Sequence, residues 1–245
     1  MRKVMWAANV RTKSFEDRLL IAQKSGYNFI SLFPIDYKTL IDQGYSTPKI
    51  KKMLADANVK VIVCDPFVQW VPNFEIPNYY PESYISFINF NEDFIFQMAD
   101  VFETEGINCV EGLNIKYEHQ LLTDAIGAFA NRADKKGLKI VLEFMPISSI
   151  NNLDDAWKII EPLSNVNLTF DTWHFFRSNS SFESLNAIPS HRIGEIQLAD
   201  AALQILGTDL SDDLLRFRKL PGKGEFEIAK LVEILKGKML TILLA

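Results

Sequence analysis

The sequence predicts an α/β protein whose parallel strands close into a barrel. Short apolar segments rich in β-branched residues alternate with longer amphipathic segments, about eight times at spacings near thirty residues. Several short segments are almost continuously hydrophobic, as expected of strands covered on both faces. A doubly wound sheet is the alternative, but "AANVRTKSFED" after the first strand offers no Gly-rich phosphate loop.

The expected strands follow one another at regular intervals along the chain. They span residues 3–9, 28–33, 59–64, 107–112, 138–144, 166–171, 192–198 and, with a weaker pattern, 239–244. Residues 14–26 are expected to form a helix, because Ser14 and Asp17 form a capping pattern and Gly26 closes the segment. A second helix is expected to end at Gly137. Two long connections, 65–81 and 199–225, follow strand ends and are expected to carry function.

Composition and charge narrow the classes of partner. The 245 residues are 48% hydrophobic and 23% charged, which suits one domain over residues 1–245. The net charge of -5 argues against a nucleic-acid surface, and no apolar stretch approaches the length of a membrane span. We expect a small-molecule partner, a cytoplasmic location, and reduced core thiols at Cys64 and Cys109.

The segment "LTFDTWHFFRS", residues 168–178, places an acid and an imidazole at the end of a buried strand. Asp171 and His174 would point to opposite faces if the strand continued through both. They can share a site only if the strand ends near Asp171 and the chain turns over its end. That geometry belongs to the carboxyl end of a parallel strand, where α/β proteins keep their ligand sites.

Polar residues recur at the other strand ends. Asp65, Glu111, Glu143, Asp171 and Gln197 close successive strands. Converging buried carboxylates require a cation or a set of donors. Oxygen ligands from Glu143, Asp171 and Gln197 would suit Mn²⁺, Mg²⁺ or Co²⁺. These residues could also have purely structural roles. Glu143 could be an acid in a salt bridge, and the Gln197 amide could form hydrogen bonds with backbone groups. We expect structural roles for Glu111, and for His119 and His191 in their helix or loop contexts.

Four ordered motifs, "LKIVLEFMP", "LTFDTWHFFRS", "IGEIQLADA" and "RKLPGKGEFEI", resemble the xylose isomerase-like TIM-barrel superfamily of sugar phosphate isomerases and epimerases. The resemblance covers nearly the whole chain and implies a divalent metal, with Zn²⁺ as a further option. It implies metal ligation by Glu143, Asp171 and Gln197, and catalytic roles for Glu143 and His174. Arg218 matches an arginine that contacts substrate, and the pocket lining would include Arg177 and Trp70.

The C-terminus departs from the family pattern. The family has an eighth strand ending in a metal-binding Glu, followed by a closing helix, whereas this chain reads "KGKMLTILLA". We therefore expect a truncated or atypical eighth strand–helix unit, and a metal site that lacks its fourth ligand, the carboxylate of the eighth strand. The apolar surface left by the missing helix is expected to be covered by a neighbouring subunit of a homo-oligomer or by a rearranged segment.

Three functions remain open from the sequence. The first is a metal-dependent sugar or sugar phosphate isomerase or epimerase, which would act on a small hydroxy-carbonyl compound through an enediolate, in carbohydrate metabolism. The second is a lyase of the dehydroshikimate dehydratase type, which "QLADA" also resembles. The third is a catalytically impaired barrel that binds a small polyol or sugar acid. DNA repair endonucleases share the fold but use additional histidines, and this chain has only three His.

Overall fold

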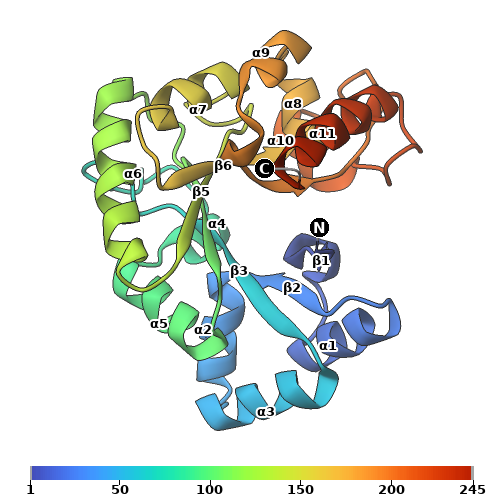
Figure 1. Ribbon diagram of the computed structural model, residues 1–245. Helices are drawn as coiled ribbons and strands as arrows, with labels where there is room; N and C mark the ends of the chain where they lie inside the picture. Colours follow the sequence, from blue (N-terminus) through green and yellow to red (C-terminus); the bar gives the residue numbers. More distant parts are fainter. Residues whose placement is uncertain (1, 244–245) are drawn as a thin grey trace. The chain divides into compact units, whose positions relative to one another are not determined.

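Strands and helices alternate from one end of the chain to the other in the computed structural model, which describes residues 2–243 (Figure 1). The strands are β1 (Val4–Met5), β2 (Phe29–Leu32), β3 (Lys60–Phe67), β4 (Gly106–Val110), β5 (Lys139–Glu143), β6 (Val166–Asp171) and β7 (Ile193–Gln197). The first seven expected strands are thus confirmed, with shifts of a few residues at their ends.

The helices follow the strands in turn. They are α1 (Phe15–Lys24), α2 (Pro34–Asp42), α3 (Thr47–Ala57), α4 (Glu82–Ile88), α5 (Glu92–Phe102), α6 (His119–Asp134), α7 (Leu153–Ile160), α8 (Thr172–Arg177), α9 (Phe182–Ala187), α10 (Leu210–Arg216) and α11 (Ile228–Leu243). Short 3₁₀ helices, η1 (Ala7–Val10) and η2 (Ser190–Arg192), precede α1 and β7.

The predicted strand at 239–244 is wrong over the residues that the structure describes. Residues 239–243 continue α11, and residue 244 lies outside the described part of the chain. A short apolar run fits a strand or a buried helix equally well, and here it follows "IAKLVEILK", which already has helical periodicity. The described residues contain no eighth strand, and the expected atypical eighth unit is confirmed.

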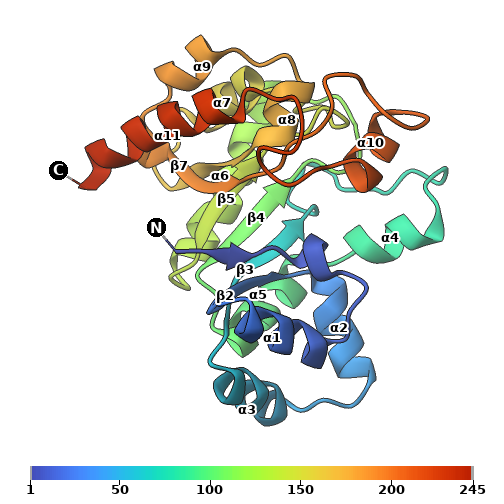
Figure 2. The same cartoon turned by 90° about the vertical axis from the view of Figure 1, so that its right-hand side faces the viewer.

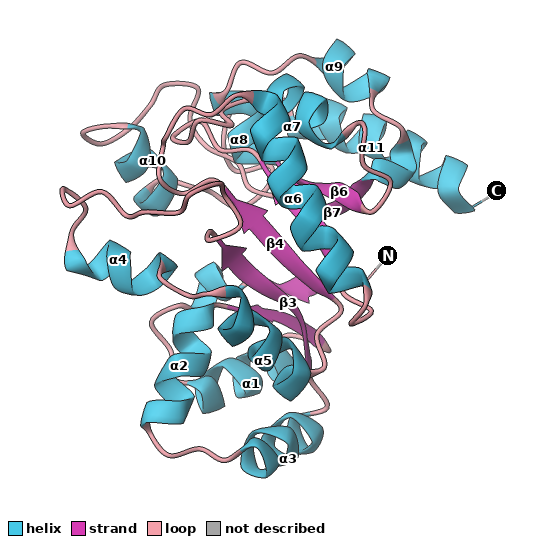
Figure 3. Cartoon of the chain, turned by 90° about the vertical axis from the view of Figure 1, so that its left-hand side faces the viewer, coloured by secondary structure: helices cyan, strands magenta, loops and turns pink. Residues whose placement is uncertain are grey.

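The chain divides into two compact units. The N-terminal unit comprises residues up to Cys109 together with Arg132–Ile140, and the C-terminal unit comprises Val110–Asn131 and the residues from Val141 onward. Each unit is built from parallel strand pairs covered by helices (Figure 3). The prediction of one domain over residues 1–245 stays a prediction.

The N-terminal unit contains β1 to β4, which pair in parallel and in sequence order (Figure 2). Helices α2 and α5 pack against β3, whose residues Val61–Asp65 are all buried. Helix α1 begins as expected, because the Ser14 hydroxyl accepts a hydrogen bond from the Asp17 N–H. Cys64 and Cys109 are free, buried thiols, as the sequence predicted.

The C-terminal unit contains β6 and β7, which pair in parallel with Thr169 opposite Glu195 and Asp171 opposite Gln197. Helices α7 and α8 pack against β6, and α11 packs against η2. Since side chains alternate along a strand, this register places Asp171, Thr169, Glu195 and Gln197 on one face of the pair. No helix among residues 2–243 is both long enough and apolar enough to cross a membrane.

Candidate functional site

The turn from β6 into α8 brings Asp171 and His174 together. Strand β6 ends at Asp171, which is also the N-cap of α8. Asp171 Oδ1 accepts hydrogen bonds from the backbone N–H groups of Trp173, at 2.7 Å, and His174, at 3.1 Å. The acid thereby satisfies donors that a helix start leaves unpaired. The predicted end of the strand at Asp171 is confirmed, and it places His174 over the strand end instead of on the opposite face.

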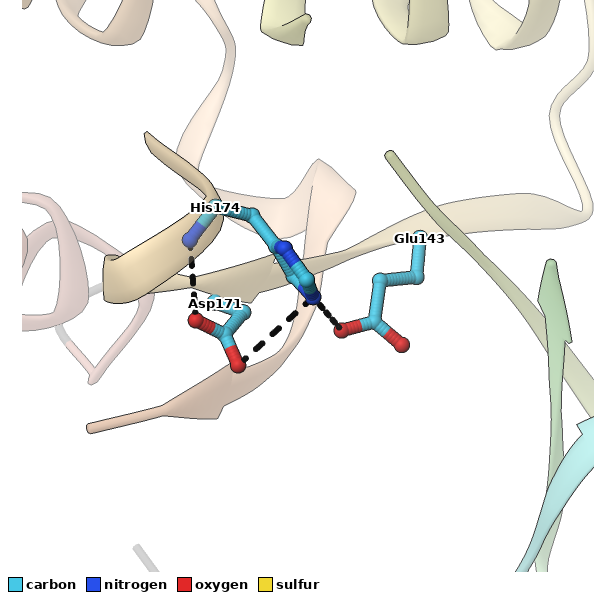
Figure 4. A group of neighbouring side chains, drawn as sticks. All are labelled: Glu143, Asp171 and His174. Atoms are coloured by element: carbon cyan, nitrogen blue, oxygen red, sulfur yellow. Dashed lines mark hydrogen bonds and ion pairs between the residues drawn. The ribbon is translucent and has the colours of Figure 1, made fainter. Parts of the chain in front are cut away.

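Three side chains converge at this point (Figure 4). His174 Nε2 lies 3.3 Å from Glu143 Oε1 and 4.0 Å from Asp171 Oδ2. One potential ligand atom from each of the three residues lies within 4.8 Å of the others, and all three residues are buried. Glu143 is the last residue of β5, so the site is built from the carboxyl ends of β5 and β6 and the first turn of α8.

Gln197 and Glu195 extend the polar surface onto β7. Gln197 lies opposite Asp171 in the strand register, and its side-chain Nε2 is buried without a hydrogen-bond partner. His174 Nδ1 and Glu195 Oε2 are also buried without a partner. Buried polar atoms are rarely left unpaired in proteins, so three in one region indicate a ligand-binding environment.

Glu195 is a further candidate site residue, which the sequence did not single out. Burial and the Glu143 carboxylate together raise the pKa of Glu195 to about 7, and a hydrogen bond with Thr169 acts in the opposite direction. The sequence could have indicated Glu195, because it lies two residues before Gln197 on the same strand and the two side chains therefore share a face of the sheet.

Arg218 supplies a positive charge to the cluster. Its Nη1 donates to Asp171 Oδ2 at 2.7 Å, and its guanidinium lies over the Trp173 ring, 5.1 Å from the centroid. Burial on its own raises the pKa of Asp171, but the charges of Arg218 and His174 and their hydrogen bonds hold that pKa below its usual value. Asp171 is therefore ionised at neutral pH.

Asp200 organises the loop that carries Arg218. Its carboxylate accepts hydrogen bonds from four backbone N–H groups, those of Ala201, Gly222, Gly224 and Phe226. Its backbone exchanges two further hydrogen bonds with Lys219, of 2.9 and 2.7 Å. Gly224 approaches so closely that a Cβ there would overlap Asp200 Oδ1 and the Ala201 carbonyl oxygen. The "QLAD" and "PGKG" segments therefore fold as one structure.

Arg177 lies in a second polar cluster within the same unit. Its Nε donates to Asp213 Oδ2 at 2.8 Å, and its other nitrogens donate to the carbonyl oxygens of Ala202 and Leu203. Asp213 also accepts from Trp173 Nε1. These bonds give Arg177 a structural role between α8 and α10, and its predicted substrate contact stays a prediction. Asp213 was missed because the run "SDD" is typical of a solvated helix face.

The remaining predicted residues lie in other settings. Trp70 is buried in the segment after β3 in the N-terminal unit, and its contact with substrate stays a prediction. Asp65 lies within β3 and accepts a hydrogen bond from Asn108 Nδ2 at 2.6 Å. Glu111 has a structural role, because its carboxylate accepts four backbone N–H groups, those of Leu113, Asn114, Ile115 and Ser149.

The donor set fits a divalent cation. Two carboxylates and an imidazole within 4.8 Å of one another could occupy adjacent positions around one ion, and the Gln197 amide would add a neutral oxygen. Carboxylate and amide oxygens favour Mg²⁺ and Mn²⁺, whereas the imidazole also suits Zn²⁺ and Co²⁺. The donors therefore favour a divalent metal without selecting one.

The fold and the cluster together match a known family. The model of the xylose isomerase-like TIM barrel family matches residues 19–240. The chain belongs to this family, as the motifs around Glu143, Asp171 and Gln197 predicted. The solved structure of IOLI protein with a binding zinc atom has a TM-score of 0.79 and 19% identity, and covers 96% of this chain and 84% of that one.

Curated relatives carry different activities. Inosose isomerase of Bacillus velezensis is 22% identical over 242 residues, which cover 94% of this chain and 81% of that protein. The 3-dehydroshikimate dehydratase of Pseudomonas aeruginosa is 30% identical over 115 residues, 46% of this chain and only 18% of that protein. A solved structure of D-psicose 3-epimerase in the presence of D-fructose has a TM-score of 0.66 and 15% identity, and covers 97% of this chain and 81% of that one.

Proposed function

We propose that this protein is a divalent-metal-dependent isomerase or epimerase of small hydroxy-carbonyl compounds, such as sugars, sugar phosphates or polyol-derived ketones. The observation that carries the proposal is the convergence of Glu143, Asp171 and His174 at the carboxyl ends of β5 and β6. The inosose isomerase similarity over 94% of the chain supports the substrate class.

Glu143, Asp171, His174 and Gln197 would hold the metal. A divalent ion at such a site supplies Lewis acidity, which polarises a carbonyl oxygen and stabilises negative charge that develops there. Glu143 would remove a proton from the carbon next to the substrate carbonyl, and the substrate would pass through an enediolate. Arg218 would orient the substrate oxygens through hydrogen bonds.

The arrangement of acids favours isomerisation over epimerisation. The family resemblance implies that epimerisation uses two carboxylates, one on each face of the substrate, whereas the two carboxylates that cluster with His174 in the described residues, Glu143 and Asp171, come from the ends of successive strands β5 and β6. Asp171 is committed to the start of α8 through two backbone N–H groups, so this proposal assigns the role of base to Glu143. One base can return the proton to the neighbouring carbon on the same face, which interconverts an aldose and a ketose or moves a carbonyl around a polyol ring.

Proton exchange in D₂O tests this proposal directly. The Mn²⁺-, Co²⁺- or Zn²⁺-loaded protein should exchange the C–H proton next to the carbonyl of an inosose or a ketohexose, as followed by mass spectrometry. Glu143→Gln should lower the exchange rate about 10²–10⁴-fold, the usual contribution of a general base. Glu183→Gln, an exposed change on α9, is the control and should exchange like the wild type. Equal rates for Glu143→Gln and wild type would rule out the proposed base.

A lyase of the dehydroshikimate dehydratase type is the second candidate. The 30% identity to the Pseudomonas aeruginosa enzyme over 115 residues favours it, and Arg218 would then face the substrate carboxylate. Incubation of the metal-loaded protein with dehydroshikimate should generate the ultraviolet band of a catechol acid if this candidate is correct. Saturable binding of a polyol or sugar acid without exchange or elimination would indicate the third function, a barrel that binds without turnover.

A further inference from the structure

The two carboxylate oxygens of Asp171 have different partners. Oδ1 accepts the backbone N–H groups of Trp173 and His174 and is committed to the start of α8. Oδ2 is the oxygen nearer to His174 Nε2, at 4.0 Å, and it therefore faces the cluster with Glu143 (Figure 4). A metal ion bound by this cluster would use Oδ2, because the backbone donors already hold Oδ1.

Arg218 holds that same oxygen. Its Nη1 lies 2.7 Å from Asp171 Oδ2, whereas the Asp171 side chain is fully buried and the Arg218 side chain is 29% exposed. Arg218 therefore reaches the carboxylate from the solvent side. The Trp173 ring, 5.1 Å from the guanidinium, gives Arg218 a second favourable contact that does not depend on Asp171.

We infer that Arg218 is an exchangeable counter-ion of the metal site: its guanidinium and a divalent cation compete for Asp171 Oδ2. This inference rests on the proposed metal site. An ion at the cluster would lie within a few ångströms of a guanidinium on the same oxygen, and like charges at that distance repel strongly in a buried setting. Metal binding therefore displaces the guanidinium from Oδ2, and the released nitrogens can bind an anionic or hydroxyl oxygen of the substrate.

The backbone next to Arg218 is anchored, so the exchange is a side-chain motion. Lys219 is hydrogen-bonded to Asp200 through both its N–H and its carbonyl oxygen, and Asp200 is bound to four further backbone groups. The guanidinium can leave Asp171 while the loop keeps its place. The exchange couples metal loading to the availability of the substrate-binding arginine, so substrate binding through Arg218 follows metal binding.

Calorimetric titration with Mn²⁺ of protein first stripped with chelator tests the inference. Arg218→Gln removes the competing charge and should bind Mn²⁺ roughly tenfold more tightly than the wild type. Arg218→Lys retains the charge and should bind with nearly wild-type affinity. Arg216→Gln is the matched control, because Arg216 is two residues away, 72% exposed and paired with Asp212; its Mn²⁺ affinity should not change.

Thermal unfolding provides a second measurement. In EDTA, Arg218→Gln should unfold at a lower temperature than the wild type, since buried Asp171 loses its cation. Saturating Mn²⁺ should remove that difference, because the metal then supplies the positive charge. A loss of stability that persists in Mn²⁺ would identify Arg218 as a purely structural residue and overturn the inference.

The outcomes separate this inference from the metal site itself. Mn²⁺ binding to the wild type with equal or weaker binding to Arg218→Gln would overturn the exchange and leave the metal site in place. No Mn²⁺ binding to any variant would overturn both. If Arg218→Gln does not fold, NMR of the wild type tests whether the guanidinium leaves Asp171. The side-chain Nε–Hε signal of Arg218 is assigned by its absence from the spectrum of Arg218→Lys. The signal should shift on addition of Zn²⁺, and an unchanged signal in zinc-saturated protein would refute the exchange.

Discussion

Glu195, a partly buried residue whose carboxyl oxygen Oε2 is enclosed, makes the stability of the protein depend on pH. Burial and the Glu143 carboxylate raise its pKa to about 7 in the folded protein, above the value of about 4.3 for an unfolded chain. Because the pKa of Glu195 is higher in the folded than in the unfolded protein, protonated Glu195 contributes fully to the free energy of unfolding below pH 4. This contribution is lost as the pH rises through 7. The wild type should therefore lose stability between pH 5 and pH 8 because Glu195 must ionise in a buried place.

Glu195→Gln should remove this loss. The variant is expected to be more stable than the wild type by about 1–3 kcal/mol at pH 8 and to gain much less at pH 5. Urea unfolding in EDTA at the two pH values measures the difference. Glu183→Gln, on the exposed face of α9, is the control and should show no such pH-dependent gain. A gain for Glu195→Gln that is the same at both pH values would contradict the raised pKa.

The two cysteines should be chemically silent in the folded protein. Burial raises the pKa of Cys64 to about 12 and raises that of Cys109 well above its ordinary value. The thiolate is the reactive form, so neither thiol should react with Ellman's reagent in native protein at pH 8, and both should react after unfolding in guanidinium chloride. Rapid labelling of either thiol under native conditions would show that its part of the sheet opens readily.

The loop from β7 to α11 is the element on which the position of Arg218 depends. Asp200 binds four backbone N–H groups of this loop, and Gly224 fits only because it has no Cβ. Asp200→Asn replaces one acceptor oxygen with a donor, and Gly224→Ala introduces an overlap with Asp200 and Ala201. We expect either change to lower the free energy of unfolding by about 1–3 kcal/mol.

Urea unfolding at pH 7 measures these losses, with Lys223→Ala as the control because Lys223 is exposed in the same loop. The two changes disrupt the same contact, so the double variant should lose less stability than the sum of the single losses. Additive losses would show that Asp200 and Gly224 act independently.

The sequence predicted the strands of this molecule and the residues at their ends. Buried parallel strands leave a clear hydrophobic pattern, and a polar residue that closes such a strand, as Glu143 and Asp171 do, is conspicuous. The sequence could not predict the helix at 239–243, because a short apolar run has no period that separates strand from helix. It also could not predict that Asp213 pairs with Arg177, since partners 36 residues apart are joined only by the fold.

The family match extends over most of the chain, and within the described residues the sheet has seven strands. Among the described residues, Glu143 and Asp171 are the carboxylates that cluster with His174 and could hold a metal ion. The association of this chain with a second copy stays a prediction. Large apolar side chains are exposed in the C-terminal unit, including Leu203 and Leu220, and self-association would reduce that exposure.

Light scattering coupled to size-exclusion chromatography measures whether the protein self-associates. The double variant Leu203→Glu, Leu220→Glu tests whether these two residues lie in the contact between the copies. A dimer that dissociates in the double variant is the expected result, because two charges would be placed in an apolar contact. A wild-type monomer over the micromolar range would contradict the expected homo-oligomer.

Anomalous diffraction from crystals grown with Mn²⁺ tests most directly whether Glu143, Asp171 and His174 bind a divalent metal. We expect one strong peak within about 2.0–2.3 Å of carboxylate oxygens of Glu143 and Asp171 and of His174 Nε2. The peak should be absent from crystals of Glu143→Ala, Asp171→Ala protein grown in the same way. Full-occupancy Mn²⁺ elsewhere in the wild type, with no peak between these three side chains, would contradict the proposed metal site.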